Sequence, residues 1–255
     1  MRKMTLYVKK DSIIHDVDPL TKLLFVFVSV AVTYILPNHT FVIGVLTFTL
    51  LLLLIGKVIH AILPIIGLSF VLILSIIIVQ GFFHPDRTTV WGTIGPLTIY
   101  KEGFSFALLL TLRVLNMVCA FGVLILTTKP DDLVDSLIRK GLSPKIGYVL
   151  LSVLQIIPQM IATKNRITDA QRSRGMETEG NLFTRLQSFI PLLSPVVLSS
   201  LSDTRERSIA LEIRGFNSKN VRTFLHEPIH FKYGLAVKIL LVVLLAAVIV
   251  WRGIL

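Results

Sequence analysis

Long apolar runs dominate this sequence and set the strongest limit on how it can fold. Five of them reach or approach the length of helix that crosses a bilayer core of ~30 Å at a rise of ~1.5 Å per residue. They cover residues 20–36, 40–56, 62–83, 104–128 and 235–251. Only 16% of the residues are charged, compared with about 25% in a typical soluble protein. The sequence therefore predicts an all-α membrane protein with about five transmembrane helices.

Basic residues are distributed unevenly over the connections between these runs. Five of them precede the first run or follow the second, namely Arg2, Lys3, Lys9, Lys10 and Lys57. The connection between the third and fourth runs holds only Arg87 and Lys101, whereas residues 129–238 contain sixteen Lys and Arg. Because basic residues favour the cytoplasmic side of a membrane, the N-terminal segment and the region 129–234 are both predicted to be cytoplasmic.

This asymmetry predicts three parts of the chain. Residues 1–128 hold the N-terminal cytoplasmic segment and four transmembrane helices, residues 129–234 form a cytoplasmic domain, and residues 235–255 form the last transmembrane helix. Lys22 and Lys238 lie near the ends of the first and last helices, where their ammonium groups are expected to reach the lipid headgroups. The basic residues of the N-terminal segment are expected to meet anionic lipid of the bilayer, and no nucleic-acid partner is expected.

The cytoplasmic region contains two further apolar runs, residues 146–162 and 186–201. Counting both as spans would move the basic stretch between them to the outside, against the charge bias, and two prolines would interrupt the second run at membrane depth. The runs are therefore predicted to lie in two long cytoplasmic helices. The first is amphipathic and continues to Arg174, and the second runs from near Pro195 to Arg214.

Both predicted helices end with the same pattern, an arginine followed by a glycine. The segments are Ser173-Arg174-Gly175 and Ile213-Arg214-Gly215, forty residues apart. A single copy is explained by the preference of Arg for the last turn of a helix and of Gly for the position after it. Recurrence on two comparable helices points to a binding role, because a guanidinium carries five donors in a fixed fork suited to acidic or carbonyl groups of a partner.

The sequence resembles the transmembrane T component of energy-coupling factor transporters over almost its whole length. Residues 12–22 are similar to the family's opening, in which Ser and His precede Asp-Pro and a Lys stands at the mouth of the first span. Residues 127–133 are similar to the stretch that leads into the family's coupling domain. The arginine motifs are similar to its paired X-Arg-X motifs, in which Ala often precedes the Arg; here Ser173 and Ile213 take that place.

The resemblance implies a mechanical function without covalent chemistry. It implies that Arg174 and Arg214 each dock into one of two cytoplasmic ABC ATPase subunits. ATP-driven motion would then pass to a separate membrane subunit, the S component, which binds a vitamin or a metal ion. The chain would have no catalytic residue and no cofactor, and would lie in the cytoplasmic membrane of a prokaryote. In agreement, Val58 follows Gly56-Lys57 where a phosphate-binding loop has Ser or Thr.

Two polar residues, Arg113 and Asn116, lie inside the fourth apolar run. Inserting a charge into a membrane costs ~2.5 kcal/mol or more, so one interpretation is a functional contact with substrate or another subunit. The other interpretation is a satisfied contact within the helix bundle. The sequence leaves both open.

The segment His226-Glu227-Pro228-Ile229-His230 has the spelling of a zinc-protease motif. That motif needs both His on one face of a helix, and Pro228 opposes a regular helix between them. With no evident third ligand, no metal site is expected. The main alternative function is a secondary transporter that binds its own substrate, for which an internal repeat would be expected; the sequence has no such repeat.

Overall fold

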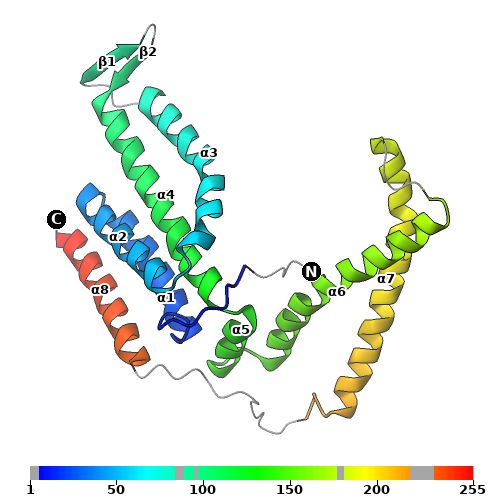
Figure 1. Cartoon of the computed structure of the whole chain (residues 1–255). Coiled ribbons are helices and arrows are strands. Elements are labelled where there is room, and N and C mark those ends of the chain that lie inside the picture. The colour runs from blue at the N-terminus through cyan, green and yellow to red at the C-terminus, as the bar shows by residue number, and fades with distance from the viewer. Residues whose placement is uncertain (1–5, 84–88, 95–96, 177–180, 219–232, 255) are drawn as a thin grey trace. The chain divides into compact units, whose positions relative to one another are not determined.

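The computed structural model describes residues 6–83, 89–94, 97–176, 181–218 and 233–254 (Figure 1). In these residues the chain forms helices and one small hairpin. In chain order the elements are α1 (Pro19–Ile35), α2 (His39–Ile55), α3 (Ile59–Phe83), β1 (Val90–Ile94), β2 (Leu97–Tyr100), α4 (Lys101–Thr127), α5 (Pro130–Arg139), α6 (Pro144–Ser173), α7 (Leu182–Ile213) and α8 (Gly234–Ile254). The predicted all-α class is confirmed, with the hairpin as an addition.

Internal contacts divide the chain into two compact units. The membrane unit consists of Met1–Gly141 and Pro228–Leu255, and the arm unit consists of Leu142–Glu227. The membrane unit holds α1 to α5, the hairpin and α8. The arm unit holds α6 and α7.

Each of the five predicted transmembrane runs forms an apolar helix. By length and composition, α3, α4 and α8 are each able to cross a membrane, and α1 and α2 are apolar helices of 17 residues. These properties confirm a multi-pass membrane protein. Helix α6 also has the length and hydropathy of a span, so its cytoplasmic location stays a prediction.

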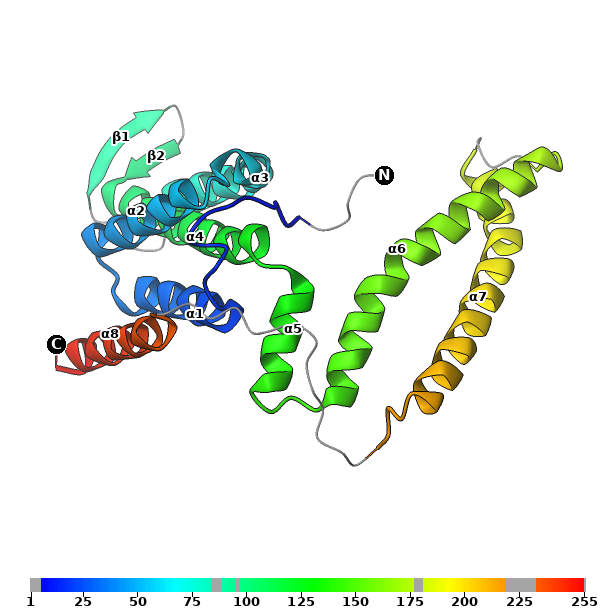
Figure 2. The same cartoon turned by 60° about the horizontal axis from the view of Figure 1, so that its bottom comes forward.

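The β1–β2 hairpin joins α3 to α4 (Figure 2). Its strands are antiparallel and pair Val90 with Tyr100 and Ile94 with Leu97. Glu102, in the first turn of α4, accepts hydrogen bonds from the backbone N–H of Thr89 at 3.3 Å and from its hydroxyl at 2.5 Å. This contact ties the hairpin to the start of α4.

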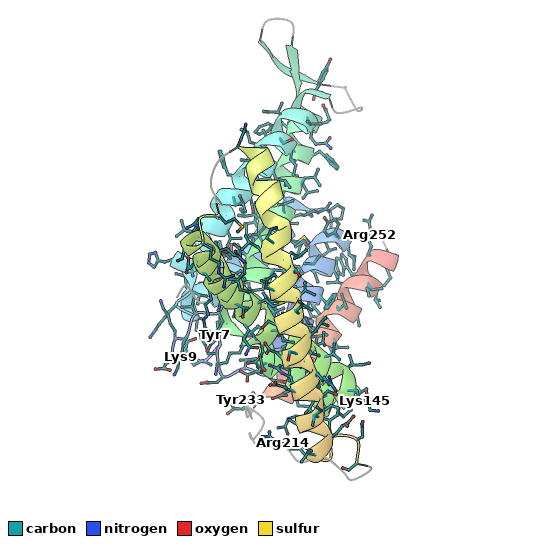
Figure 3. All side chains as sticks on the ribbon, turned by 90° about the vertical axis from the view of Figure 1, so that its right-hand side faces the viewer. Tyr7, Lys9, Lys145, Arg214, Tyr233 and Arg252 are labelled. Atoms are coloured by element: carbon teal, nitrogen blue, oxygen red, sulfur yellow. The ribbon has the colours of Figure 1, made fainter. Side chains whose placement is uncertain are left out.

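Helix α8 packs against α1. At its first turns, Lys238 forms an ion pair with Asp18, the residue that precedes α1. Farther along, apolar side chains of α8 pack on those of α1, and Arg252 lies in the last turn of α8 (Figure 3). One ion pair and one apolar seam therefore hold the C-terminal helix to the rest of the membrane unit.

The prediction that the ammonium group of Lys22 reaches the lipid headgroups was wrong. Its side chain is only 4% exposed. The ammonium donates to the backbone carbonyls of Thr127 and His15. The physical reason is that carbonyls of the same chain lie within its reach and replace the headgroups as acceptors.

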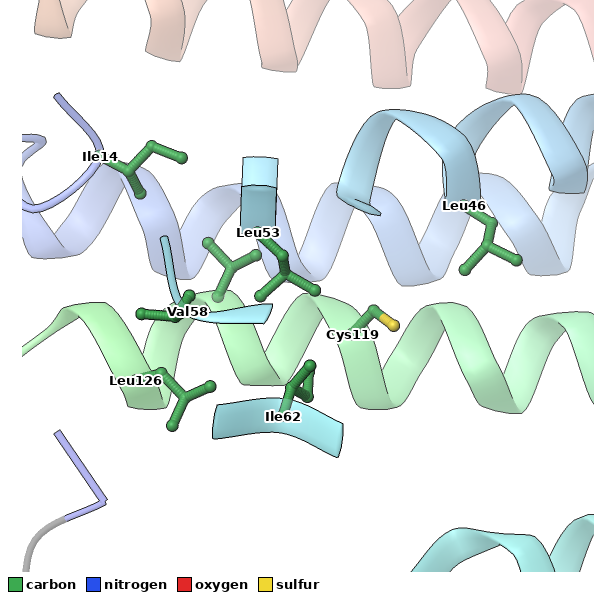
Figure 4. Packing of buried hydrophobic residues seen from close by; sticks show 8 residues of the cluster. Ile14, Leu46, Leu53, Val58, Ile62, Cys119 and Leu126 are labelled. Carbon is green, nitrogen blue, oxygen red and sulfur yellow. The ribbon is translucent and has the colours of Figure 1, made fainter. Parts of the chain in front are cut away.

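The core of the membrane unit lies around α4, which packs against α1, α2 and α3. The largest group of buried apolar side chains is shown in Figure 4 and comprises Ile14, Leu46, Leu53, Val58, Ile62, Cys119, Val123 and Leu126. Because lipid tails are as apolar as these side chains, close packing and small residues hold helices together in a bilayer. Gly122 provides such a close approach, since a Cβ there would lie 2.1 Å from Cδ1 of Ile62.

Gly122→Ala should destabilise the purified protein, because the new methyl group would overlap the fully buried side chain of Ile62. Overpacking of this kind costs ~1–3 kcal/mol, which we expect to lower the midpoint of thermal unfolding in detergent. Gly44→Ala in α2 is the matched control, since nothing lies within 4 Å of its Cβ position. Equal midpoints for the two variants would contradict this account of the α3–α4 contact.

Candidate functional site

The two arginine motifs lie at the C-terminal ends of α6 and α7, the long helices of the arm unit. Helix α6 has Pro144 at its start, where the missing N–H breaks no internal hydrogen bond. Helix α7 begins at Leu182, so the predicted start near Pro195 was wrong. The helix continues through Pro191 and Pro195, since a proline removes only one hydrogen bond of the helical ladder.

Both helices end in the same hydrogen-bonded turn, as the sequence predicted. In each, the glycine N–H donates to the carbonyl three residues earlier, and the next N–H donates to the carbonyl five residues before it. The pairs are Gly175–Arg172 (2.9 Å) and Met176–Gln171 (3.1 Å) after α6, and Gly215–Glu212 (2.9 Å) and Phe216–Leu211 (3.0 Å) after α7. Gly175 and Gly215 have φ of +85° and +72°, a conformation that glycine adopts without strain.

This turn leaves Arg174 and Arg214 exposed at the ends of their helices, as Figure 3 shows for Arg214. Within the described residues, neither guanidinium has a hydrogen-bond or ion-pair partner. Ile213 is 82% exposed beside Arg214, and the hydroxyl of Ser173 donates back to the carbonyl of Asp169 at 3.0 Å. At the C-terminal ends of α6 and α7, the arginines are therefore the side chains with hydrogen-bond donors available to a partner.

The helices of the arm unit pack antiparallel. Nη2 of Arg207 donates to Oε1 of Gln159 at 3.3 Å, and the rings of Tyr148 and Phe216 meet edge to face with centroids 5.1 Å apart. This register separates Arg174 from Arg214 by about 23 residues of helix, or roughly 34 Å at ~1.5 Å per residue. The two arginines therefore lie too far apart to enter one binding groove.

Helix α6 carries an apolar face that α7 leaves uncovered. The predicted members of this face are all substantially exposed: Ile146, Leu150, Val153, Leu154, Ile157 and Ile161. In contrast, side chains of Gln159, Thr163, Asp203 and Arg207 line the contact between the two helices. The helix pair thus meets through polar, apolar and aromatic side chains and still leaves an apolar surface on α6 uncovered.

Arg113 joins α4 to the end of α1. Its Nε donates to the carbonyl of Thr33 at 2.8 Å, and its guanidinium lies 5.1 Å from the centre of the Tyr34 ring. Thr33 belongs to the last turn of α1, where carbonyls lack helical partners and a positive charge opposes the helix dipole. Sequence reasoning did not identify Thr33 or Tyr34, because no local pattern marks a contact between residues about eighty positions apart.

Asn116 is fully buried and joins α4 to both α1 and α2. Its Nδ2 donates to the hydroxyl of Ser29 at 3.0 Å, and its Oδ1 accepts from the hydroxyl of Thr49 at 3.0 Å. Of the two interpretations of Arg113 and Asn116, this geometry favours a satisfied contact within the bundle.

Metal-binding geometry does not occur in the part of the chain that the structure describes, where no three His, Cys, Asp or Glu side chains gather. The segment from His226 to His230 lies outside the described residues.

Comparisons with known proteins agree with this architecture. A family model described as "Cobalt transport protein" (CbiQ) matches residues 10–224. A protein of Streptococcus equi subsp. equi is 30% identical over 231 residues, which cover 85% of this chain and 84% of that one. A protein of Brevibacillus brevis is 30% identical over 261 residues and 96% of each chain.

A protein of Staphylococcus aureus is 29% identical over 233 residues, which cover 85% of this chain and 84% of that one. All three relatives are named energy-coupling factor transporter transmembrane protein EcfT. The resemblance inferred from the motifs is therefore confirmed, and the chain belongs to the CbiQ/EcfT family of transporter transmembrane components.

Proposed function

We propose that the chain is the energy-coupling subunit of an ABC-type importer. It would receive movement from two cytoplasmic ATPases and pass it to a separate membrane subunit that binds a vitamin or a metal ion. The observation that carries this proposal is the matching turn at the C-terminal ends of α6 and α7, each with one exposed arginine that has no partner among the described residues. Two separated docking points fit two ATPase subunits better than one.

The proposed assignment of parts follows the chain. Residues 1–128 and 235–255 would anchor the protein in the membrane, and residues 129–234 would form the cytoplasmic coupling domain. Helix α5 lies at the start of residues 129–234 but within the membrane unit, and it packs against α1. We infer that α5 is the junction at which the coupling domain acts on the membrane helices.

The uncovered apolar face of α6 supports a partner within or beside the bilayer. Exposed Val153 and Ile157 would be costly in water at ~25 cal/mol per Å² of apolar surface. The substrate-binding membrane subunit, or lipid, would remove this face from water. The relatives' names specify no substrate, and the family description names cobalt, so the proposed substrate class stays a vitamin or a metal ion.

The polar residues of the membrane helices support a coupling subunit over a secondary transporter. Arg113 donates to α1, and Asn116 exchanges hydrogen bonds with α1 and α2, so polar groups of both residues are engaged within the bundle. The proposal therefore assigns these two residues to the bundle, gives the chain no catalytic residue, and assigns substrate recognition and ATP hydrolysis to its partners.

The topology can be tested by labelling a cysteine introduced at Asn181, in the connection between α6 and α7. The native Cys119 is fully buried, so it gives little background. A membrane-impermeant maleimide should react with Asn181→Cys in inverted vesicles and not from the outside of intact cells. Labelling of intact cells would place α6 and α7 across the membrane.

The coupling role can be tested by replacing Arg174 and Arg214 singly and together with Ala. A hydrogen bond to a charged group contributes ~1.5–3 kcal/mol, so each change should reduce ATPase association about tenfold or more, and the double change further. Lys should rescue poorly because it lacks the planar fork. The measurements are co-purification of ATPases with the tagged chain and ATP-dependent uptake by cells.

Arg166→Ala in α6 and Arg205→Ala in α7 are matched controls. Both residues are exposed, lie on the same two helices and carry the same charge, so these variants should retain the ATPases. If the arginines only oppose helix dipoles, each is worth ~0.3–1 kcal/mol and Lys substitutes well. Wild-type uptake by the double Ala variant would therefore refute the coupling role.

A further inference from the structure

The segment before α1 folds back over the ends of other helices in the membrane unit. The N–H of Val8 donates to the carbonyl of Leu126 in the last turn of α4 at 3.0 Å. The ammonium of Lys10 donates to the carbonyl of Lys57, in the turn after α2, at 2.6 Å. Ile14 contributes its side chain to the buried cluster that contains Leu126 (Figure 4). Ile14 and these two hydrogen bonds therefore tie the segment to the core of the membrane unit.

Lys22 links this segment to the end of α4. Its ammonium donates to the carbonyl of Thr127 at 3.1 Å and, more weakly, to the carbonyl of His15 at 3.4 Å. Thr127 is the last residue of α4, where helical carbonyls lack internal partners and a positive charge opposes the helix dipole. The side chain of Lys22 in α1 thus stabilises the C-terminal end of α4.

The ring of His15 makes hydrogen bonds that stabilise the segment before α1. Its Nε2 lies 2.9 Å from the carbonyl of Val8, and its Nδ1 lies 2.7 Å from the hydroxyl of Ser12. The neutral imidazole satisfies both contacts if Nε2–H donates to the carbonyl and Nδ1 accepts from the hydroxyl. The ring therefore ties Val8 and Ser12 to the residue whose carbonyl is one of the two acceptors of Lys22.

We propose that Lys22, supported by residues 8–18, forms a joint that transmits movement of the coupling domain to the membrane helices. Only Thr128 and Lys129 separate α4 from α5. If the end of α4 were loose, rotation of α5 would be absorbed in this short connection. Because Lys22 fixes the Thr127 carbonyl and α5 packs against α1, the movement reaches α1 and α4 together. This inference rests on the proposed function.

A buried lysine is an expensive way to achieve packing alone. An ionised ammonium taken out of water needs acceptors or counter-charges, and an apolar side chain of similar length would pack more cheaply. Here Asp16 and Asp132 border the same cavity of about 170 Å³ as Lys22. This cavity would also admit water to the two carbonyls if the ammonium were removed, so Lys22→Met should weaken the joint without unfolding the bundle.

The test compares Lys22→Met with Lys238→Met in the whole transporter complex, purified with its partners and reconstituted into vesicles. Lys238 also stands in the first turns of an apolar helix, yet it contacts Asp18 and not the end of α4. Labelled cobalt ion and labelled vitamins are offered in separate runs. The substrate accumulated by the wild-type complex is then used to measure molecules transported per ATP hydrolysed.

Lys22→Met should retain both ATPases and hydrolyse ATP, but transport per ATP should fall about tenfold, since a hydrogen bond from a charged group is worth roughly one such factor. Lys238→Met should keep the wild-type ratio. Ser12→Ala removes only the hydrogen bond to His15, so its transport per ATP should lie between the values of Lys22→Met and Lys238→Met. Amide hydrogen exchange over residues 125–133 should be faster in Lys22→Met than in Lys238→Met.

A purely structural role for Lys22 would lower transport and ATP hydrolysis in proportion. An unchanged ratio of transport to ATP hydrolysis in Lys22→Met would therefore contradict the proposed joint. If Lys22→Met does not assemble, an unchanged ratio and unchanged exchange in Ser12→Ala would overturn it equally. Failure of the proposed function is distinguishable, because the wild-type chain would then purify without ATPases.

Discussion

The contacts of Asn116 are the interaction on which the membrane unit depends most. A bilayer provides no hydrophobic force between apolar helices, so packing and buried hydrogen bonds determine how they associate. Asn116 donates to Ser29 of α1 and accepts from Thr49 of α2, so one residue of α4 positions two neighbouring helices. An apolar residue at this place would leave the helices free to slide against one another.

Polar contacts between α4 and α1 recur along α4. Arg113 reaches the carbonyl of Thr33, Asn116 reaches Ser29, and Thr127 accepts from Lys22. Helix α4 is therefore fixed to α1 near its middle and at its C-terminal end. A bundle held in this way can move as one body, which is what the proposed coupling role requires.

Sequence reasoning predicted the features that depend on local patterns. Apolar runs located five apolar helices, α1 to α4 and α8, and an arginine followed by glycine located the ends of α6 and α7. It failed for Lys22, which finds an acceptor about one hundred residues away, and for the start of α7, which continues through two prolines. The β1–β2 hairpin was missed because its strands are too short to show a period.

The central claim is that each arginine end meets a different ATPase, and photo-cross-linking in cells tests it most directly. A photoreactive amino acid is placed beside each arginine, at Ser173 or at Ile213, and the cross-linked peptides are identified by mass spectrometry. The account predicts that both positions capture ATP-binding subunits, while a probe at Trp251 in α8 captures none. Capture of lipid alone at Ser173 and Ile213 would contradict the account.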